Sequence, residues 1–335
     1  MKILITTGLS PDDIGGPFQY APRLKEAFEL LGYSVEIVSY GNIEKTLPPW
    51  IRHFYFLIKV LPKMLWSNVA LSLDTYSTGV PTVILGLVLR KKIIVRIGGD
   101  YLWSTYVNRT GSPVTLGEFY DRLPKLNTKE KLIMRFLGFL ITKADMLVFN
   151  TEWQRNIWSR FYVLQDKRTR IVRNFIPEKH IARHVGQKNF LWVGRIIPEK
   201  NILFLQKLAD KISEKYPDFR LDIVTGKPHN EVLEIIKGSY AVVSATFTDI
   251  CPNFIIEGIS FNKPFIMTKE TGLREIYPQG GIFVDPKDVQ AWERSIETML
   301  EDESYNSFIE ELKGISPVHS WQDLAQEFIE IWKNL

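Results

Sequence analysis

The sequence contains one cysteine, Cys251, which has no partner for an internal disulfide. A chain this poor in cysteine is typical of the reducing cytoplasm, and we expect a cytoplasmic protein. Every apolar run falls short of the ~18 residues that indicate a membrane-spanning helix. The opening residues, MKILITTGLSPDD, predict a first strand and a polar turn instead of a signal peptide. These absences argue against integral membrane proteins and disulfide-rich secreted proteins.

Three kinds of functional motif are also missing. The five histidines show no metal-ligand spacing and no carboxylate cluster indicates a metal site, so we interpret them as surface or packing residues: His53, His180, His184, His229 and His319. The turn after the first strand lacks the Gly-x-Gly-x-x-Gly motif of nicotinamide dehydrogenases. Basic residues are dispersed without a recognition motif, so nucleic acid is not an expected partner.

Charge is present in unequal halves. Residues 1–186 hold 26 Lys and Arg against 15 Asp and Glu, a balance of +11, whereas the remaining 16 and 23 give −7, which together make the net +4. This split indicates two domains, and 335 residues suffice for two cores. It leaves two interpretations open: an uneven solvated surface, or a first half that docks on an anionic membrane or a lipid-phosphate acceptor.

The order of predicted elements favours an α/β fold. Apolar strands alternate with helical patterns, which is typical of parallel, doubly wound sheets. The first half predicts strands at 2–7, 35–40, 69–73, 92–97, 146–150 and 169–172. After a polar linker at 176–187, the second half predicts strands at 189–193, 221–225, 241–246, 264–268 and 282–284. We expect domains at 1–184 and 185–318, with residues 319–335 as a helix that crosses back to the first domain.

Residues 47–66 form an aromatic and basic stretch, LPPWIRHFYFLIKVLPKMLW. The composition predicts either a helix on the membrane surface or a buried core helix, with Pro62 as an interruption.

The longest chemically informative stretch runs from Ser244 to Glu275. A predicted strand leads to Asp249, Pro252 opens a helix, and Glu257 follows Asp249 by eight residues. The free N–H groups of a helix start bind anions, and a neighbouring carboxylate can hold hydroxyl groups. This pattern predicts a pocket for a nucleotide-sugar. The alternative is that Asp249 only caps the following helix.

A second motif, VGRIIPEKN, places Arg195 and Lys200 after a predicted strand. Two cations five residues apart can neutralise a diphosphate without a metal ion. One charge-assisted contact contributes roughly 1.5–3 kcal/mol, so losing both would weaken binding by roughly a hundredfold to ten-thousandfold. Taken alone, such a pair is more often a surface feature.

The order of these motifs resembles the retaining GT-B glycosyltransferases of family 4, the group 1 type. The resemblance covers nearly the whole chain and is carried by Gly15-Gly16, Ile171–Pro177, Val193-Gly194-Arg195, Pro198–Asn201, Gly226, Asp249-x7-Glu257-Gly258, Lys263-Pro264 and Gly272–Ile276. It implies two Rossmann-like domains that face a central cleft. The first would bind the acceptor and the second the nucleotide-sugar.

The resemblance also implies roles for individual residues. Arg195 and Lys200 match the pair that grips the donor diphosphate. Asp249 matches the acid that holds donor-sugar hydroxyls, and Glu257 matches the acid that binds ribose. The remaining matches are backbone positions, with Asn253, Phe254 and Ile255 at sugar or phosphate, Gly226 near the nucleobase, and Gly15 and Gly16 near phosphate and acceptor.

The chain departs from the family pattern at two places. Its first acid is Asp249 in place of the usual Glu, and Ile250 and Pro252 replace the usual glycines. Related enzymes often have a histidine near the end of the fourth strand, where this chain has Asp100 beside Arg96. Asp100 is therefore a candidate for contact with sugar or acceptor. It can equally serve the backbone of a tight turn.

The expected function is transfer of a sugar from a nucleoside diphosphate donor, a UDP- or GDP-sugar, to a glycan, lipid-linked or small-molecule hydroxyl. The resemblance implies retention at the anomeric carbon, and the two cations imply that no metal or cofactor is needed. We expect a role in cell-envelope polysaccharide synthesis at the inner face of the plasma membrane. Two alternatives stay open: a nucleotide-sugar epimerase-like enzyme, and a non-catalytic binding subunit.

Overall fold

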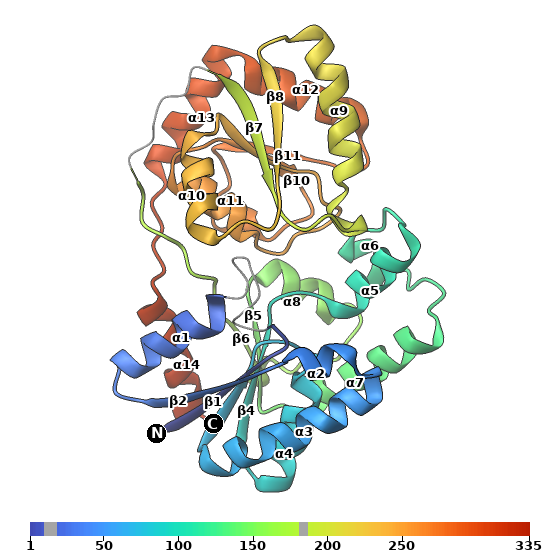
Figure 1. Ribbon diagram of the computed structural model, residues 1–335, viewed down its shortest axis with the longest axis vertical. Coiled ribbons are helices and arrows are strands. Elements are labelled where there is room, and N and C mark those ends of the chain that lie inside the picture. The colour runs from blue at the N-terminus through green and yellow to red at the C-terminus, as the bar shows by residue number, and fades with distance from the viewer. Residues whose placement is uncertain (10–18, 181–186) are drawn as a thin grey trace. The chain divides into compact units, whose positions relative to one another are not determined.

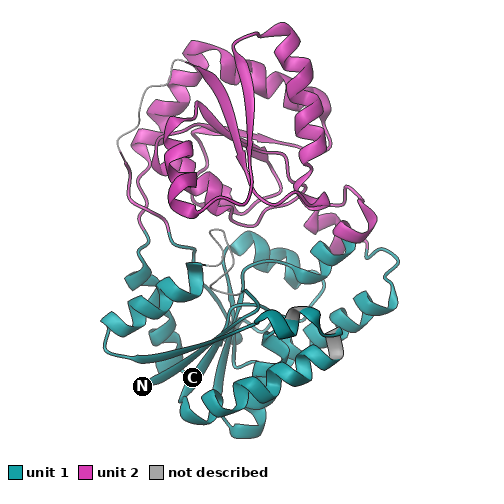
Figure 2. Cartoon of the chain, in the orientation of Figure 1, with its two compact units in different colours: residues 1–106, 123–175, 319–335 teal, residues 107–122, 176–318 magenta. Residues whose placement is uncertain are grey.

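The computed structural model describes residues 1–9, 19–180 and 187–335. It divides the chain into two compact units (Figures 1 and 2). Unit 1 comprises Met1–Tyr106, Leu123–Phe175 and His319–Leu335, and unit 2 comprises Val107–Arg122 and Ile176–Val318. These ranges differ from the expected domains, because the second unit takes residues 107–122 from the first half and begins at 176.

Unit 1 is built on a six-stranded parallel sheet. Its strands have the order β2-β1-β3-β4-β5-β6 and are β1 (Lys2–Thr7), β2 (Ser34–Ser39), β3 (Val69–Ser72), β4 (Lys92–Ile97), β5 (Met146–Phe149) and β6 (Thr169–Ile171). In register, Ile3 pairs with Val35 on one side and Val69 on the other. Every residue of β3 and β5 is buried, as expected for central strands covered on both faces.

In the sequence, the helices of unit 1 alternate with these strands, and one more helix follows at the end of the chain. They are α1 (Tyr20–Leu30), α2 (Asn42–Thr46), α3 (Pro49–Trp66), α4 (Gly79–Leu89), α7 (Thr128–Lys143), α8 (Glu152–Ser159), α14 (Trp321–Lys333) and the short η2 (Asp166–Arg168). α5 (Tyr101–Thr110) begins in unit 1 and ends in unit 2. α14 packs on α1, where Trp332 and Phe28 have ring centroids 5.7 Å apart.

α3 corrects one expectation. Pro62 lies inside a continuous helix and does not interrupt it. A proline costs an interior helix one hydrogen bond and adds a clash. Here Phe56, Val60 and Met64, spaced by four residues, are completely buried along one side of the helix. Their burial holds the helix in place through the proline.

Unit 2 contains a five-stranded parallel sheet with the order β11-β10-β9-β7-β8. The strands are β7 (Lys188–Val193), β8 (Phe219–Val224), β9 (Ala241–Ser244), β10 (Phe265–Thr268) and β11 (Gly281–Val284). The other elements are α6 (Leu116–Asp121), η3 (Pro198–Lys200), α9 (Ile202–Lys215), α10 (His229–Gly238), α11 (Asn253–Ser260), η4 (Leu273–Glu275), α12 (Val289–Leu300) and α13 (Asp302–Gly314).

Alternation along β7 divides the core of unit 2 into two layers. Phe190 and Trp192 belong to the cluster that includes α9 and α12, whereas Leu191 belongs to the cluster that includes α10. Both faces of the sheet are therefore covered by helices. Two parallel α/β sheets in one chain confirm the predicted fold class.

Candidate functional site

Unit 2 places the candidate site where its strand order reverses. β7 lies between β8 and β9, so the chain leaves β7 in one direction and later returns to its other side. Ligands of open parallel sheets bind at such a switch point, beyond the carboxyl ends of the strands. Arg195 and Lys200 follow β7, and Asp249 follows β9. The predicted cations and the first predicted acid thus come from the two strands that flank this point.

Lys200 and Asp249 form an ion pair. Lys200 Nζ lies 2.9 Å from Asp249 Oδ2, and the two side chains are 24% and 20% exposed. Burial lowers the pKa of Lys200, but the carboxylates of Asp249 and Glu199 outweigh it, so this pKa lies above its ordinary value. The positive charge of Arg195 acts against that increase, and the Arg195 side chain is exposed. Of the two predicted cations, Lys200 is therefore paired and Arg195 is accessible.

The backbone around Lys200 is held from the neighbouring loop. The carbonyl oxygen of Glu199 accepts hydrogen bonds from Thr246 Oγ1 at 3.0 Å and from Phe247 N at 3.1 Å. Asn201 adopts a left-handed conformation with φ 52°, and its amide donates to the Ala245 carbonyl. Asparagine tolerates this conformation better than most residues. The loops after β7 and β9 are consequently one connected structure.

Asp249 is followed closely by α11. Its N–H donates to the Glu270 carbonyl at 3.1 Å, which fixes the loop against the segment after β10. Pro252 precedes α11 and supplies no side-chain cap to it. The first residues of this helix are Asn253, Phe254 and Ile255, of which Ile255 is completely buried. Any contact of Ile255 with a ligand would therefore involve its backbone.

Glu257 lies on α11 and has a partner that the sequence did not suggest. Glu257 Oε1 is 2.9 Å from His229 Nε2, and the side chains are 18% and 39% exposed. His229 begins α10, three residues after Gly226, which adopts φ 64°. His229 is thus a partly exposed residue, as expected, and its contact with Glu257 is the feature that the sequence did not predict. Its place at a helix start after a turn glycine was the signal in the sequence.

The remaining predicted residues lie elsewhere. Gly15 and Gly16 fall outside the described residues. Asp100 belongs to unit 1, is 6% exposed and accepts a hydrogen bond from Trp103 N at 2.8 Å at the start of α5. This contact gives Asp100 a helix-capping role. Its predicted contact with sugar or acceptor stays a prediction. Arg96 is buried and hydrogen-bonds Asn174.

Comparison with known proteins gives partial matches in sequence and full-length matches in structure. No family model matches the chain. An uncharacterised glycosyltransferase from Methanocaldococcus jannaschii is 25% identical over 183 residues, which cover 44% of this chain. The match spans 45% of that curated relative, less than half of its length.

Solved structures resemble the chain over its whole length. Sucrose-phosphate synthase from Thermosynechococcus elongatus has a TM-score of 0.73 at 13% identity and covers 100% of this chain and 99% of its own. HepE from Anabaena, crystallised with UDP and glucose, has a TM-score of 0.70 at 13% identity with both chains covered completely. The lipopolysaccharide outer core galactosyltransferase WaaB has a TM-score of 0.62 at 14% identity, again with complete coverage. The chain has the GT-B fold of these proteins.

Proposed function

We propose that the protein is a glycosyltransferase that transfers a sugar from a nucleoside diphosphate-sugar to an acceptor hydroxyl. The observation that carries this proposal is the Lys200–Asp249 pair at the switch point of the second sheet. It joins a cation suited to a diphosphate with a carboxylate suited to sugar hydroxyls. Asp249 lies four residues before the start of α11, the predicted anion-binding turn.

The proposed chemistry is electrostatic and requires no metal ion. As the bond between the anomeric carbon and the diphosphate oxygen breaks, negative charge builds up on the leaving group. Arg195, Lys200 and the first N–H groups of α11 would stabilise that charge. The acceptor oxygen forms the new bond on the same face of the sugar, and its proton passes to the departing diphosphate oxygen. Retention follows from the family resemblance.

We assign the other predicted residues to the donor and the acceptor. Asp249 would hold sugar hydroxyls, Glu257 the ribose hydroxyls, and Gly226 would let the backbone approach the nucleobase. Asn253 and Phe254 would contribute backbone N–H groups, as would Ile255. Gly15, Gly16 and Asp100 would act from unit 1. UDP- and GDP-sugars are the proposed donors, and the UDP in the HepE crystals supports the former.

The acceptor is proposed to be a glycan or a lipid-linked molecule at the inner face of the plasma membrane. α3 exposes a row of apolar side chains, with Phe54 65%, Ile58 53% and Leu65 59% exposed. These positions lie on one side of a helix, away from the buried row described above. The basic side chains Lys59 and Lys63 are ion-paired with Glu44 and Glu36, so the apolar row would make the main contact. Among the described residues, no helix is both long enough and apolar enough to cross a bilayer.

The test is thermal unfolding with UDP, GDP, ADP and dTDP in metal-free buffer. A nucleotide at 100 times its dissociation constant should stabilise the wild type by about 2.7 kcal/mol. The double variant Arg195→Ala/Lys200→Ala should lose this response, because the diphosphate would have no cation. Sugar-nucleotides of the same base are then tested for transfer and for epimerisation.

Three outcomes would contradict the proposal. An epimerised nucleotide-sugar without release of nucleoside diphosphate would identify the epimerase-like alternative. Binding without turnover on any acceptor would favour a non-catalytic subunit. No shift with any of the four nucleotides would remove the diphosphate assignment itself. Lys211→Ala, which breaks an exposed ion pair between α9 and α12, is the matched control for loss of a lysine.

A further inference from the structure

Residues 107–122 belong to unit 2, although the chain on either side of them belongs to unit 1 (Figure 2). This 107–122 segment contains the last turn of α5 and all of α6. Its apolar side chains Val107, Leu116, Phe119 and Tyr120 are buried. Thr115 and Glu118 form a capping box at the start of α6, so the segment has a defined local structure.

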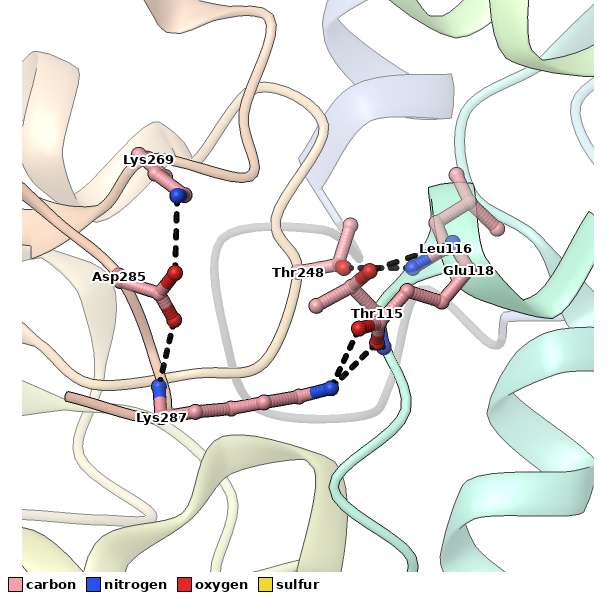
Figure 3. Close-up of polar contacts among 7 residues, drawn as sticks. All are labelled: Thr115, Leu116, Glu118, Thr248, Lys269, Asp285 and Lys287. Atoms are coloured by element: carbon pink, nitrogen blue, oxygen red, sulfur yellow. Dashed lines mark hydrogen bonds and ion pairs between the residues drawn. The ribbon is translucent and has the colours of Figure 1, made fainter. Parts of the chain in front are cut away.

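The segment hydrogen-bonds three loops that follow different strands of unit 2. Asn108 contacts Glu199, in the loop after β7, and Leu116 N donates to Thr248 Oγ1 at 2.9 Å, in the loop after β9. Glu118 pairs with Lys287, in the loop after β11, with Lys287 Nζ 2.5 and 2.6 Å from the two carboxylate oxygens (Figure 3). All three loops leave the carboxyl edge of the parallel sheet, so the segment lies along the edge that carries the candidate site.

Two of these contacts are made to the residues that directly precede Lys200 and Asp249 in the chain. Asn108 Nδ2 donates to Glu199 Oε2 at 3.1 Å, and Asn108 Oδ1 accepts from Glu199 N at 3.1 Å. Lys200 is the next residue. Thr248, which accepts from Leu116 N, immediately precedes Asp249. The segment therefore holds both members of the Lys200–Asp249 pair through their neighbours in the chain.

The third contact continues into a row of charges. Lys287 N donates to Asp285 Oδ1 at 2.9 Å, and Lys269 Nζ lies 2.8 Å from Asp285 Oδ2 (Figure 3). Lys269 follows β10, and Asp249 N donates to the carbonyl of the next residue, Glu270. The row thus reaches back to the loop that contains Asp249.

We propose that the 107–122 segment holds the loops of the candidate nucleotide-binding site in place. Asn108 and Thr248 are the positioning residues for Lys200 and Asp249. This inference rests on the proposed function for its role in donor binding. The inference requires that Lys200 stays paired with Asp249 only while the Asn108–Glu199 contact is intact. This dependence can be measured without a nucleotide.

The experiment compares four full-length chains: wild type, Asn108→Asp, Glu199→Gln and the double variant. Asn108→Asp replaces the amide that donates to Glu199 by a carboxylate, so that two carboxylates face one another. In the double variant the glutamine amide introduced at position 199 can donate to the carboxylate introduced at position 108. The double variant thus restores the hydrogen bond with the amide and the carboxylate in exchanged positions, and it keeps the number of carboxylates at one. The measurement is the rate at which an acetylating reagent modifies Lys200 in the folded protein, followed by mass spectrometry over a series of pH values. The rate constant of the neutral amine is compared between variants, because the carboxylate introduced at position 108 also raises the pKa of Lys200.

The expected result is that Asn108→Asp raises the labelling rate of Lys200 about tenfold, the factor for net loss of one hydrogen bond to a charged group, and that the double variant returns it toward wild type. The same variants should lose and regain affinity for UDP in parallel. A second pair, Thr248→Val and Thr248→Ser, tests the other contact, because only serine keeps the hydroxyl acceptor for Leu116 N.

Labelling separates this inference from the proposed function. If no nucleoside diphosphate binds the wild type, the donor assignment fails, while Lys200 labelling still decides whether the segment positions the pair. An unchanged labelling rate in folded Asn108→Asp and Thr248→Val would overturn the inference, even if UDP binds. So would a double variant as reactive as Asn108→Asp. Lys211→Ala should leave Lys200 labelling at the wild-type rate.

Discussion

At the scale of single residues, the candidate site contains two paired carboxylates with different partners, Asp249 with Lys200 and Glu257 with His229. Lys200 and Asp249 are already paired with each other, so a bound diphosphate-sugar would have to share or divide the pair. Glu257 is instead paired with His229, on a neighbouring helix. The proposal assigns the first pair to the diphosphate and the sugar, and the second to the nucleoside.

A comparison of UDP with pyrophosphate can separate these assignments. Glu257→Gln keeps a hydrogen-bonding group beside His229 but removes the charge that would accept ribose hydroxyls. We expect UDP affinity to fall by roughly tenfold to a hundredfold, as for a lost charge-assisted hydrogen bond, with pyrophosphate affinity unchanged. Titration calorimetry measures both ligands.

Lys200→Ala provides the contrast, because it should weaken UDP and pyrophosphate alike. The nucleoside assignment of Glu257 is wrong if Glu257→Gln weakens pyrophosphate as much as UDP. Replacement of His229 by alanine should reproduce only part of the Glu257→Gln effect, since it removes orientation and leaves the carboxylate.

At the scale of elements, the packing of α11 on β9 decides where its first turn lies. A Cβ added to Gly258 would come 2.7 Å from Val242 Cγ2. Gly258→Ala should therefore destabilise the protein by about 1–3 kcal/mol, as overpacked sites do, and weaken UDP binding by displacing α11. Urea unfolding monitored by tryptophan fluorescence gives the stability.

The controls for this prediction lie in the same unit. Gly238 ends α10 with nothing within 4 Å of an added Cβ, so Gly238→Ala should be neutral or stabilising by up to ~1 kcal/mol. Val242→Ala in the Gly258→Ala background should restore part of the loss. Equal midpoints for the two glycine variants would contradict the close approach of α11 to β9.

The exposed row on α3 gives a prediction for membrane contact. Phe54→Ser/Ile58→Ser should reduce sedimentation with phosphatidylglycerol vesicles severalfold, because burying such side chains contributes about 1.5–3 kcal/mol each when complete and less at an interface. Neutral phosphatidylcholine vesicles should bind the wild type more weakly, given the +11 balance of residues 1–186.

Leu203→Ser is the matched substitution on α9 in unit 2, where Leu203 is 70% exposed. It should sediment as the wild type does. Equal sedimentation of the wild type and the α3 variant would remove α3 from the membrane proposal and leave the +11 balance as its only support.

Sequence periodicity was sufficient for the strands and for most long helices, since buried parallel strands are short apolar runs between turns. The helix expected within residues 47–66 is present as α3, but its expected interruption at Pro62 is wrong, because the burial of Phe56, Val60 and Met64 outweighs the cost of the proline. Sequence periodicity also missed α6, although Thr115 and Glu118 carry the spacing of a capping box. A helix of six residues has too few turns for apolar periodicity to be visible.

At the scale of the whole molecule, the division of the chain was the least predictable feature. The assignment of residues 107–122 depends on partners about 90, 130 and 170 positions later in the chain, such as Glu199, Thr248 and Lys287. Contacts at that separation are invisible to local patterns. Arg195 and Lys200 were predicted from a local motif, whereas the His229–Glu257 pair joins residues 28 positions apart and was not predicted.

His319 begins the last segment of unit 1 and gives this unit a pH-dependent contact. Its Nδ1 lies 3.0 Å from the Asn174 carbonyl oxygen and its Nε2 lies 3.4 Å from Glu327 Oε1. Burial lowers the pKa of His319, but Glu327 and the Asn174 carbonyl raise it more, so the pKa lies above its ordinary value. A raised pKa means that the protonated ring stabilises the folded state. This contribution is complete below the unfolded pKa of about 6.5 and is lost as the pH rises through the folded value.

We therefore expect the wild type to lose more thermal stability between pH 6 and pH 8 than His319→Gln, a comparison across ~2 pH units around the unfolded pKa. Melting temperatures across that range provide the measurement. Parallel pH profiles for the two proteins would exclude His319 as the titrating group. Glu327→Gln should flatten the profile as well, because it removes the charge that favours the imidazolium.

The chain passes between the two units four times, at 106/107, 122/123, 175/176 and 318/319. This limits how the proposed donor specificity could be exchanged with a related protein by recombination. A chimera that imports only residues 176–318 would bring Glu199, Thr248 and Lys287 without their partners on the 107–122 segment. Exchange of unit 2 therefore requires both residues 107–122 and residues 176–318 from the other protein. A library with a single crossover point cannot transfer these two ranges without also transferring residues 123–175 of unit 1.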